Sequence, residues 1–380
     1  MIYADNAATT RISDSVFEKM LPFLREQYGN ASSQYSFGAK AKQAIEQARQ
    51  QVATAVGAKK NEIIFTSGGS EANSWVLQSI AEFFKHEPLH FITSAIEHHS
   101  ILNTCHALQL GGVEVTYLPV NAYGQIEVEE VISAIQPNTK LVSIMLANNE
   151  IGTIQPIGNI GKYLHEKGIL FHTDAVQAVG HIPVNVNTLN IDFLTASAHK
   201  FNGAKGTGFL YKRTGIKLPS QVFGGEQEHG ERAGTENVAG IVALGYALEE
   251  SIAEITTVNK NLSALVQTTV CGLKKLIPGI KINGEGGKRL PGTVNLTFPH
   301  VSGTAMMHLL DLKGICVSTS SACNSGKDEP SHVLLALGLS EKQAMSAVRI
   351  SYGKYNTPEE VNFIVNEINS AYSKITDTVV

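Results

Sequence analysis

Two charged side chains lie just after neighbouring apolar runs in the middle of the chain, where strands of a sheet are expected to end. Asp174 follows residues 169–173 directly, and Lys200 comes 26 positions later, beyond the run at 191–195. A lysine can bind pyridoxal 5′-phosphate (PLP) as a Schiff base, and a carboxylate can keep the pyridine nitrogen of that cofactor protonated, so that the ring acts as an electron sink. A salt bridge or a helix N-cap explains the same residues without a cofactor. The pair therefore indicates PLP chemistry only together with a phosphate-binding segment.

Small and hydroxyl-bearing residues that can bind a phosphate stand near other predicted strand ends. Residues 66–71 read Thr-Ser-Gly-Gly-Ser-Glu and open a predicted helix, whose N-terminal N–H groups favour an anion. By itself the glycine pair is a tight turn with a serine N-cap, and it does not match the G-x-G-x-x-G fingerprint of dinucleotide-binding proteins. Together with the acid and the lysine, Gly69, Ser70 and Ser197 predict a PLP site.

Histidines and asparagines follow two further runs, as Glu97-His98-His99 and as Asn148-Asn149. Two adjacent histidines cannot both face one site from a helix, so one can stack or titrate while the other packs, and a lone loop histidine is more often structural. Consecutive asparagines commonly form turns, but they can also orient a substrate carboxylate or a ring hydroxyl. The residues alone leave both interpretations open.

Short apolar runs and amphipathic stretches alternate over residues 60–215. This alternation predicts an α/β fold with a mainly parallel sheet between helices, and almost continuously apolar runs are typical of strands buried on both faces. In such a sheet, ligands bind beyond the carboxyl ends of the strands, which is where the residues above lie. The predicted strands are 62–66, 89–93, 113–117, 141–145, 169–173, 191–195 and 208–211, and the predicted helices between them are 70–84, 99–110, 127–135 and 157–167.

The remaining segments predict flanking helices and a second, smaller unit. Residues 38–56 are typical of a helix that ends at Gly57, and residues 237–276 are mostly helical. Strands at 292–297 and 347–351 with helices at 303–312 and 358–374 predict an α+β domain. We assign residues 13–255 to a large PLP-binding domain, and residues 1–12 with 256–380 to the small domain.

The composition limits the possible partners. The formal net charge is −4 and no basic stripe is present, which argues against direct contact with nucleic acid. Asp5 stands where a signal peptide is apolar, and no apolar run approaches the roughly 18 residues of a membrane span, so we expect a cytoplasmic protein without membrane contact. The four cysteines form no C-x-x-C pair, which argues against a disulfide framework and against a metal site.

Ordered motifs along essentially the whole chain resemble those of the cysteine desulfurases of the NifS/IscS type. These enzymes are fold-type I PLP-dependent transferases of the class V aminotransferase family. The resemblance implies a large domain with a mainly parallel sheet between helices, and a smaller α+β domain. The motifs lie at residues 3–10, 29–33, 64–68, 97–98, 148–152, 174–177, 199–200, 232–237, 320–323, 329–332 and 349–351.

The resemblance also implies individual roles. Lys200 binds PLP and moves protons at the substrate Cα, while Asp174 pairs with the pyridinium nitrogen. Gln177 hydrogen-bonds the ring hydroxyl, and His98 stacks on the ring and can move a proton on the substrate thiol. Asn149 contacts the cofactor and, with Arg349, the substrate carboxylate, because a planar guanidinium suits bidentate binding. The phosphate is assigned to Gly69, Ser70, Ser197 and His199, with Thr235 reaching the phosphate of the partner subunit in a homodimer.

Cys323 is the implied nucleophile that receives the sulfur. It lies in the segment at about 318–330, which is rich in small polar residues. Such residues bury little apolar area, so the segment is predicted to be mobile. An ordinary exposed thiol is the alternative, but accessible thiols in flexible segments are the reactive ones. Cys105, Cys271 and Cys316 have apolar neighbours and are predicted to pack in the interior.

The activity implied by the resemblance is the PLP-dependent removal of sulfur from L-cysteine. The products are L-alanine and a persulfide on Cys323, from which an acceptor protein takes the sulfur for iron–sulfur cluster assembly or another thiolation route. Aminotransfer, selenocysteine lysis and desulfination of cysteine sulfinate stay open as other PLP reactions, and an inactive PLP-binding scaffold subunit is the alternative of another class. The chain departs from the family pattern at Gly69-Ser70, where Ala-Thr is usual, although a hydroxyl is kept.

Overall fold

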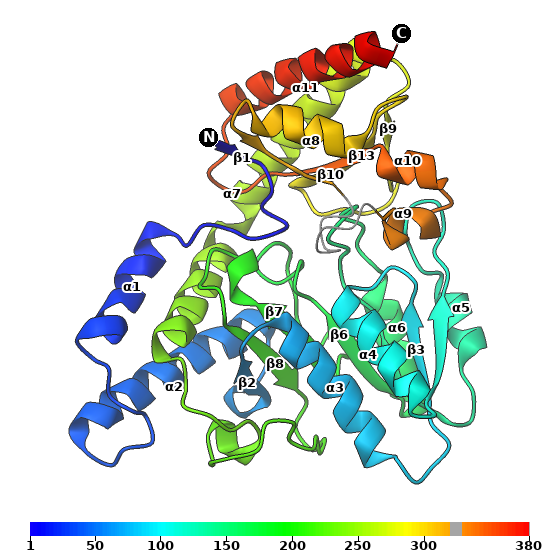
Figure 1. The fold of residues 1–380 in the computed structure, drawn as a ribbon. Coiled ribbons are helices and arrows are strands. Elements are labelled where there is room, and N and C mark those ends of the chain that lie inside the picture. Colours follow the sequence, from blue (N-terminus) through cyan, green and yellow to red (C-terminus); the bar gives the residue numbers. More distant parts are fainter. Residues whose placement is uncertain (320–328, 380) are drawn as a thin grey trace.

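In the computed structural model, which describes residues 1–319 and 329–379, the largest sheet has seven strands in the order β2-β8-β7-β6-β5-β3-β4 (Figure 1). The pairings from β4 through β3, β5 and β6 to β7 are parallel, whereas β8 runs antiparallel to both β7 and β2. The predicted mainly parallel sheet is therefore confirmed. Its strands are β2 (Ile63–Thr66), β3 (His90–Ser94), β4 (Glu114–Leu118), β5 (Thr139–Ser143), β6 (Leu170–Asp174), β7 (Phe193–Ser197) and β8 (Gly208–Lys212).

The strand β5 differs from its predicted bounds, because it begins two residues earlier and ends at Ser143. The apolar run continues to Met145, but the backbone N–H of Met145 donates to a carboxylate oxygen of Glu97 at 2.9 Å instead of to a neighbouring strand. The N–H groups of Ile144 and Leu146 still donate to carbonyl oxygens of β6, so only the pairing with β3 ends at Ser143.

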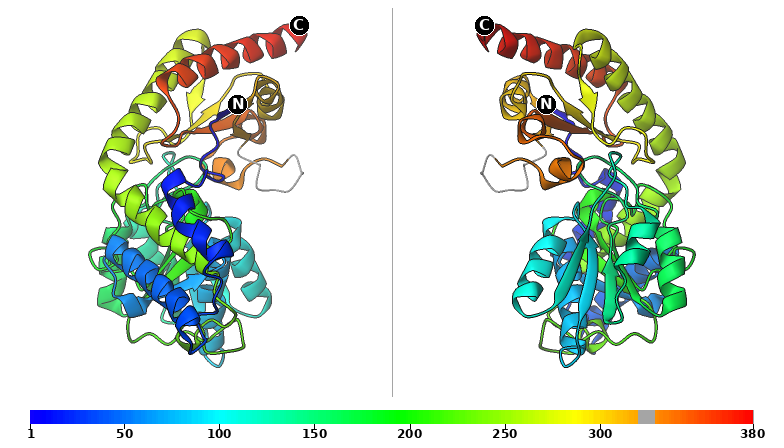
Figure 2. Two further views of the ribbon diagram at one scale, coloured as in Figure 1. Left: turned by 90° about the vertical axis from the view of Figure 1, so that its left-hand side faces the viewer. Right: turned by 90° about the vertical axis from the view of Figure 1, so that its right-hand side faces the viewer.

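Alternate residues of the strands enter two different hydrophobic clusters. Ile64 and Phe91 contact the cluster that contains the buried faces of α3 and α4. Their neighbours Phe65 and Ile92 belong to the cluster that includes residues of α2, α6 and α7 on the opposite face. Side chains alternate between the faces of a strand, so the sheet is buried on both sides, and helices cover both faces (Figure 2).

The helices of this part of the chain agree closely with the predicted ones. Gly57 ends α2 in the left-handed region, with φ of 71°. A further helix, α1, begins where the Ser13 side chain accepts a hydrogen bond from the N–H of Val16, and it is an addition to the predicted elements. The helices are α1 (Asp14–Arg25), α2 (Ser36–Val56), α3 (Gly69–Phe83), α4 (His99–Leu110), α5 (Val128–Ala134), α6 (Ile157–Lys167) and α7 (Val238–Leu276).

A second sheet of four antiparallel strands, in the order β12-β13-β10-β9, packs against the C-terminal helices. The N-terminal strand β1 pairs in parallel with β11, so the start of the chain lies beside this sheet. These strands are β1 (Ile2–Tyr3), β9 (Lys281–Ile282), β10 (Thr293–Thr297), β11 (Ile315–Cys316), β12 (Ser318–Thr319) and β13 (Ala347–Ser351), and the helices are α8 (Gly303–Asp311), α9 (His332–Ala336), α10 (Glu341–Met345) and α11 (Pro358–Val379).

The two sheets are joined in two ways. Helix α7 runs from beside the large sheet to beside the small one (Figure 1), and the predicted domain boundary at 255–256 falls inside it. A small apolar cluster also joins Ile96 and Met145, which follow strands of the large sheet, to Val333 and Leu334 of α9. The division into residues 13–255 and residues 1–12 with 256–380 stays a prediction.

Across the described part of the chain, no helix is both long enough and apolar enough to span a bilayer. The same residues contain no cluster of three or more His, Cys, Asp or Glu side chains that could hold a metal ion.

Helix α3 is predicted to depend on its buried face for stability. Leu77 is fully buried between α3 and the sheet, so Leu77→Ala should lower the free energy of unfolding by about 2–5 kcal/mol. Leu110→Ala is the matched control, because Leu110 is 82% exposed, and it should change the same quantity by less than about 0.5 kcal/mol. Urea unfolding of both variants measures the difference, and equal effects would contradict the assignment of this face to the core.

Candidate active site

One cavity of about 490 Å³ lies at the carboxyl ends of the parallel strands. Its volume is in the range of cofactor and ligand sites. It brings together every predicted site residue except Thr235 and Cys323. The predicted residues that line it are Gly69, Ser70, His98, Asn149, Asp174, Gln177, Ser197, His199, Lys200 and Arg349.

Asp174 is the last residue of β6, and its side chain is buried. One carboxylate oxygen accepts a hydrogen bond from the side-chain N–H of Asn73 at 2.6 Å. The other accepts one from the backbone N–H of Val176 at 3.0 Å. These two donors fix the plane of the carboxylate at the wall of the cavity, where it can accept a further N–H from a bound ring.

Lys200 ends a short helical turn, Ala198–Lys200, that follows β7 directly. Its Nζ donates to the carbonyl oxygens of Ala7 at 2.7 Å and of Ala8 at 2.8 Å. The carbonyl of Lys200 itself accepts a hydrogen bond from Nε2 of His181 at 2.9 Å. The backbone and the amine of Lys200 are therefore both held in place, with the amine at the cavity.

The N-terminus of α3 forms another wall of the cavity. A Cβ added at Gly69 would lie 2.7 Å from Cγ2 of Val176, and one added at Gly68 would lie 3.6 Å from Oγ of Ser197. Val176 thus occupies the space that a side chain at position 69 would need, which gives a physical reason for glycine where alanine is usual in the family. The close approach brings the first N–H groups of α3 and the Ser197 hydroxyl together, an arrangement that favours an anion.

His199 lies beside this wall, and Nδ1 of its ring is 3.1 Å from Oγ1 of Thr9. Burial, together with the positive charges of Lys200 and Lys205, lowers the pKa of His199 to about 4. The imidazole is therefore neutral at physiological pH, and it can donate one hydrogen bond to an anion without bringing a charge.

His98 caps the N-terminus of α4, where its Nδ1 accepts the backbone N–H of Ser100 at 3.1 Å. Burial lowers the pKa of His98, and the positive charge of Lys200 lowers it further against the opposing effect of Asp174. The ring is therefore expected to be neutral, and since Nδ1 is an acceptor, its proton lies on Nε2. A neutral ring with a defined tautomer can both stack on a cofactor and exchange a proton.

In each of the two pairs of adjacent residues, His98-His99 and Asn148-Asn149, only one side chain faces the cavity. His99 packs away from the cavity, with its ring centroid 4.8 Å from that of His332. Asn148 is buried and forms a turn, since its side-chain oxygen accepts the N–H groups of Glu150 and Ile151. Only His98 and Asn149 line the cavity.

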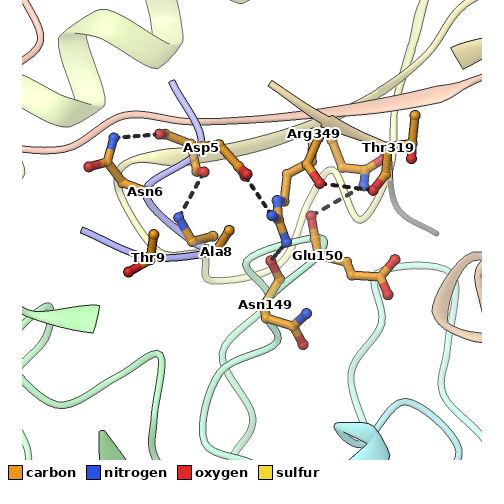
Figure 3. Close-up of polar contacts among 12 residues, drawn as sticks. Asp5, Asn6, Ala8, Thr9, Asn149, Glu150, Thr319 and Arg349 are labelled. Atoms are coloured by element: carbon orange, nitrogen blue, oxygen red, sulfur yellow. Dashed lines mark hydrogen bonds and ion pairs between the residues drawn. The ribbon is translucent and has the colours of Figure 1, made fainter. Parts of the chain in front are cut away.

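Arg349 enters the cavity from β13 of the small sheet, and its side chain is only 5% exposed. Nη1 donates to the carbonyl of Asn149 at 3.0 Å, and Nη2 forms an ion pair with Asp5 at 2.7 Å (Figure 3). The guanidinium is thus oriented by two acceptors that come from distant parts of the sequence.

Two predicted residues are not placed in this cavity. Thr235 lines a separate cavity of about 200 Å³ together with Arg232 and Glu236, so within one chain it does not meet the others. Cys323 lies outside the described residues. Its role and that of Thr235 stay predictions.

The other cysteines differ from one another in exposure. Cys105 is buried, and burial raises the pKa of its thiol to about 12, in agreement with a packing role. Cys316 is half-buried. The prediction that Cys271 packs in the interior is wrong, because this residue of α7 is exposed. Its position on the solvent side of a long helix was not evident from its apolar neighbours.

Three residues of the site were missed by sequence reasoning. Asn73 holds Asp174, Asp5 holds Arg349, and Glu97 is fully buried next to His98. The signal for Asn73 was its place one helical turn after Ser70, on the same face of α3. Asp5 and Glu97 stand inside two of the recognised motifs, but the motifs alone did not assign them a partner.

The class of protein follows from a comparison with family models. The model "Aminotransferase class-V" matches residues 2–364. The chain therefore belongs to the class V aminotransferase family, whose members depend on PLP.

Within that family the chain is similar to cysteine desulfurases of the IscS and NifS type. It is 48% identical over 374 residues to the cysteine desulfurase IscS of Methanosarcina thermophila, with 98% of this chain and 92% of that protein covered. It is also 48% identical to the cysteine desulfurase IscS of Clostridium botulinum over 366 residues, with 96% and 92% covered.

Solved structures give the same result. A NifS-like protein matches with a TM-score of 0.93 at 40% identity, covering 98% of this chain and 99% of the other. A NifS-like protein from Rickettsia africae matches with a TM-score of 0.89 at 33% identity, again over 98% and 99%. The predicted fold class and family are confirmed.

Glu97 is predicted to make stability depend on pH. One of its oxygens accepts the hydroxyl of Ser94 at 2.5 Å and the N–H of Met145, while within the described residues the buried Oε2 has no hydrogen-bond partner. Burial, with a smaller effect from the charge of Asp174, raises the pKa of Glu97 from 4.5 to about 8. The folded protein thus keeps a proton that the unfolded chain releases, so stability is lost as the pH rises from about 5 through 8.

Glu97→Gln removes that dependence, because glutamine has the size of the protonated acid and stays neutral. The free energy of unfolding of this variant minus that of the parent should increase from pH 5 to pH 8 and level off above. Glu18→Gln, at an exposed position, measures the effect of removing a surface carboxylate over the same range. If the free energy of unfolding, relative to the parent, changes with pH in the same way for Glu97→Gln as for Glu18→Gln, the pKa of Glu97 is not raised.

Proposed function

We propose that the chain is a cysteine desulfurase that uses PLP to remove sulfur from L-cysteine, releasing L-alanine and leaving the sulfur on Cys323. The observation that carries the proposal is one cavity in which Lys200, Asp174 and Arg349 converge. The relatives described above, which bear the name cysteine desulfurase, support it. An amine, a carboxylate and a guanidinium in one place suit an amino-acid substrate bound to a cofactor.

The donor set of the cavity fits PLP. The N-terminus of α3 with Ser70, Ser197 and His199 can hold a phosphate, and Asp174 can accept the proton of a pyridinium nitrogen. When bound, PLP supplies an electron sink for the charge that develops at the substrate Cα. Gln177, whose amide donates to the carbonyl of Ala7 at 2.9 Å, is assigned to the ring hydroxyl.

The other residues of the cavity are assigned to substrate binding and proton transfer. Arg349, with Asn149 beside it, binds the substrate carboxylate and so fixes the orientation of the Cα proton. Lys200 takes that proton, because its amine is the basic group held at the cavity. His98, neutral and with its proton on Nε2, exchanges a proton with the substrate thiol.

Cys323 is assigned the transfer of sulfur. Its thiolate attacks the substrate sulfur, an S–S bond forms, and the C–S bond breaks. The electron pair of the broken bond stays with the substrate carbon, which takes up a proton and becomes the methyl group of alanine. A sulfur-acceptor protein, such as an iron–sulfur scaffold or a thiolation protein, then takes the sulfur from Cys323.

A comparison of two cysteine variants tests the proposal. Cys323→Ser should fold and bind PLP as the parent does, but should release almost no alanine from L-cysteine, because a serine hydroxyl is a poor nucleophile toward sulfur near neutral pH. Cys271→Ser is the matched control, since Cys271 is an exposed cysteine with no assigned role, and it should keep the parental rate. Alanine is measured in the presence of a thiol reductant.

Turnover by Cys323→Ser at the parental rate would contradict persulfide transfer and favour a lyase that acts without an enzyme thiol. A parent protein that carries PLP but forms no alanine would favour the inactive scaffold subunit.

We also propose that two chains share each phosphate site in a homodimer. Thr235 lies away from its own chain's cavity, which suits a residue that serves the partner. Sedimentation should therefore show a dimer, and Thr235→Val should raise the Kd for PLP by about tenfold or more, since a hydrogen bond to a charged group contributes about 1.5–3 kcal/mol. A monomer that stays fully active at high dilution would exclude the shared site.

A further inference from the structure

The N-terminal strap, defined as Asp5–Ala8, lines the cavity through Asp5, Ala7 and Ala8, and no role in the reaction has yet been assigned to it. It is tied to the end of β13, where the N–H of Asn6 donates to the carbonyl of Ser351 at 2.9 Å and the N–H of Ala7 donates to the Ser351 hydroxyl at 2.9 Å. Asp5 itself forms a parallel bridge with Ser351. The strap is therefore fixed two residues away from Arg349 on the same strand.

The strap contacts the large-domain side of the cavity as well. The carbonyl of Ala7 accepts both Nζ of Lys200 and the side-chain amide of Gln177, and the carbonyl of Ala8 accepts Nζ of Lys200. The same four residues thus touch the amine that is assigned to the cofactor and the guanidinium that is assigned to the substrate. A short segment with contacts on both sides can hold these groups at a fixed separation.

The pair Asp5–Arg349 is the most constrained of these contacts. The side chain of Arg349 is 5% exposed and that of Asp5 is 18% exposed. A guanidinium with so little water around it is costly unless a partner holds it. Glu150 is another acid near Arg349, but its carboxylate accepts the Ser331 hydroxyl at 2.5 Å, and burial raises its pKa to about 7. Of the acids that the structure describes, Asp5 forms the ion pair with Arg349 (Figure 3).

Arg349 has N–H donors that its hydrogen bonds to the described residues do not use. Nη2 donates to Asp5 and Nη1 to the carbonyl of Asn149. In the part of the chain that the structure describes, the buried Nε has no hydrogen-bond partner, although a guanidinium carries five N–H donors in a rigid fork. The two acceptors therefore fix the plane of the fork while donors remain for a substrate carboxylate.

We propose that Asp5 is a positioning residue for the α-carboxylate of the substrate, acting through Arg349. This inference rests on the proposed function in two respects, namely that PLP occupies the cavity and that Arg349 binds the carboxylate. It follows that Asp5 affects the binding of amines that carry a carboxylate and has no effect on the corresponding amines that lack one.

Binding of L-alanine and of ethylamine to the PLP-loaded protein, measured by calorimetric titration, tests this inference. Asp5→Ala removes the acceptor of Nη2, and the Kd for L-alanine should rise about tenfold, in keeping with the loss of a charged hydrogen bond. The Kd for ethylamine should change by less than about twofold, because ethylamine offers Arg349 no carboxylate. Asp5→Asn keeps an acceptor oxygen at the same place, so it should retain the affinity for L-alanine within about threefold.

Asp14→Ala is the matched control, because Asp14 is an exposed acid of the same N-terminal region, and it should leave both Kd values unchanged. Equal losses for the two ligands in Asp5→Ala would mean that the strap only maintains the fold of the cavity, and no loss for either would mean that Asp5 does not position Arg349. Both results overturn the inference. If Asp5→Ala does not fold, Asp5→Glu, which moves the carboxylate by one methylene, gives the same comparison, and a loss restricted to L-alanine is again required.

Neither ligand contains sulfur, so the titrations do not depend on sulfur transfer. A failure of the inference would therefore appear in binding, whereas a failure of the proposed function would appear as an absence of alanine formed from cysteine.

Discussion

A carboxylate held away from water at the end of β6 is the constraint on which the site depends. Asp174 is 5% exposed and accepts hydrogen bonds from Asn73 of α3 and from the backbone of Val176. A negative charge at such a place is costly unless its donors are fixed. The packing of α3 against β6 and β7 must therefore be maintained to within a hydrogen-bond length. The same packing brings the N-terminus of α3 next to Ser197.

The second half of the site comes from the small sheet. Arg349 reaches the cavity from β13, and Asp5 meets it from the start of the chain. The site is complete only when the two sheets are docked, and the apolar cluster around Met145 and Leu334 lies at that junction. The cavity and the association of the two sheets are thus linked by a few buried contacts, and the long helix α7 also spans both units.

Much of this arrangement could be predicted from the sequence, because a position at the end of a predicted strand indicates at which edge of the sheet a residue lies. The residues at or just beyond the ends of β3, β5, β6 and β7 share one edge of a parallel sheet, so the sequence alone could group His98, Asn149, Asp174 and Lys200. Pairwise contacts across distant segments could not be predicted, since no local pattern links Asp5 to Arg349. Nor does an apolar neighbourhood show which face of a helix a residue occupies, as the exposed Cys271 demonstrates. The role of Thr235 depends on a second chain.

Lys200 is proposed to carry the cofactor in the cavity that Asp174 lines. Reduction of the purified, PLP-loaded protein with borohydride, followed by peptide mapping, tests it most directly, because reduction makes a lysine–PLP linkage permanent. One pyridoxyl group is expected, on the peptide that contains Lys200. A label on a different lysine, or a protein in which no lysine is labelled, would contradict it.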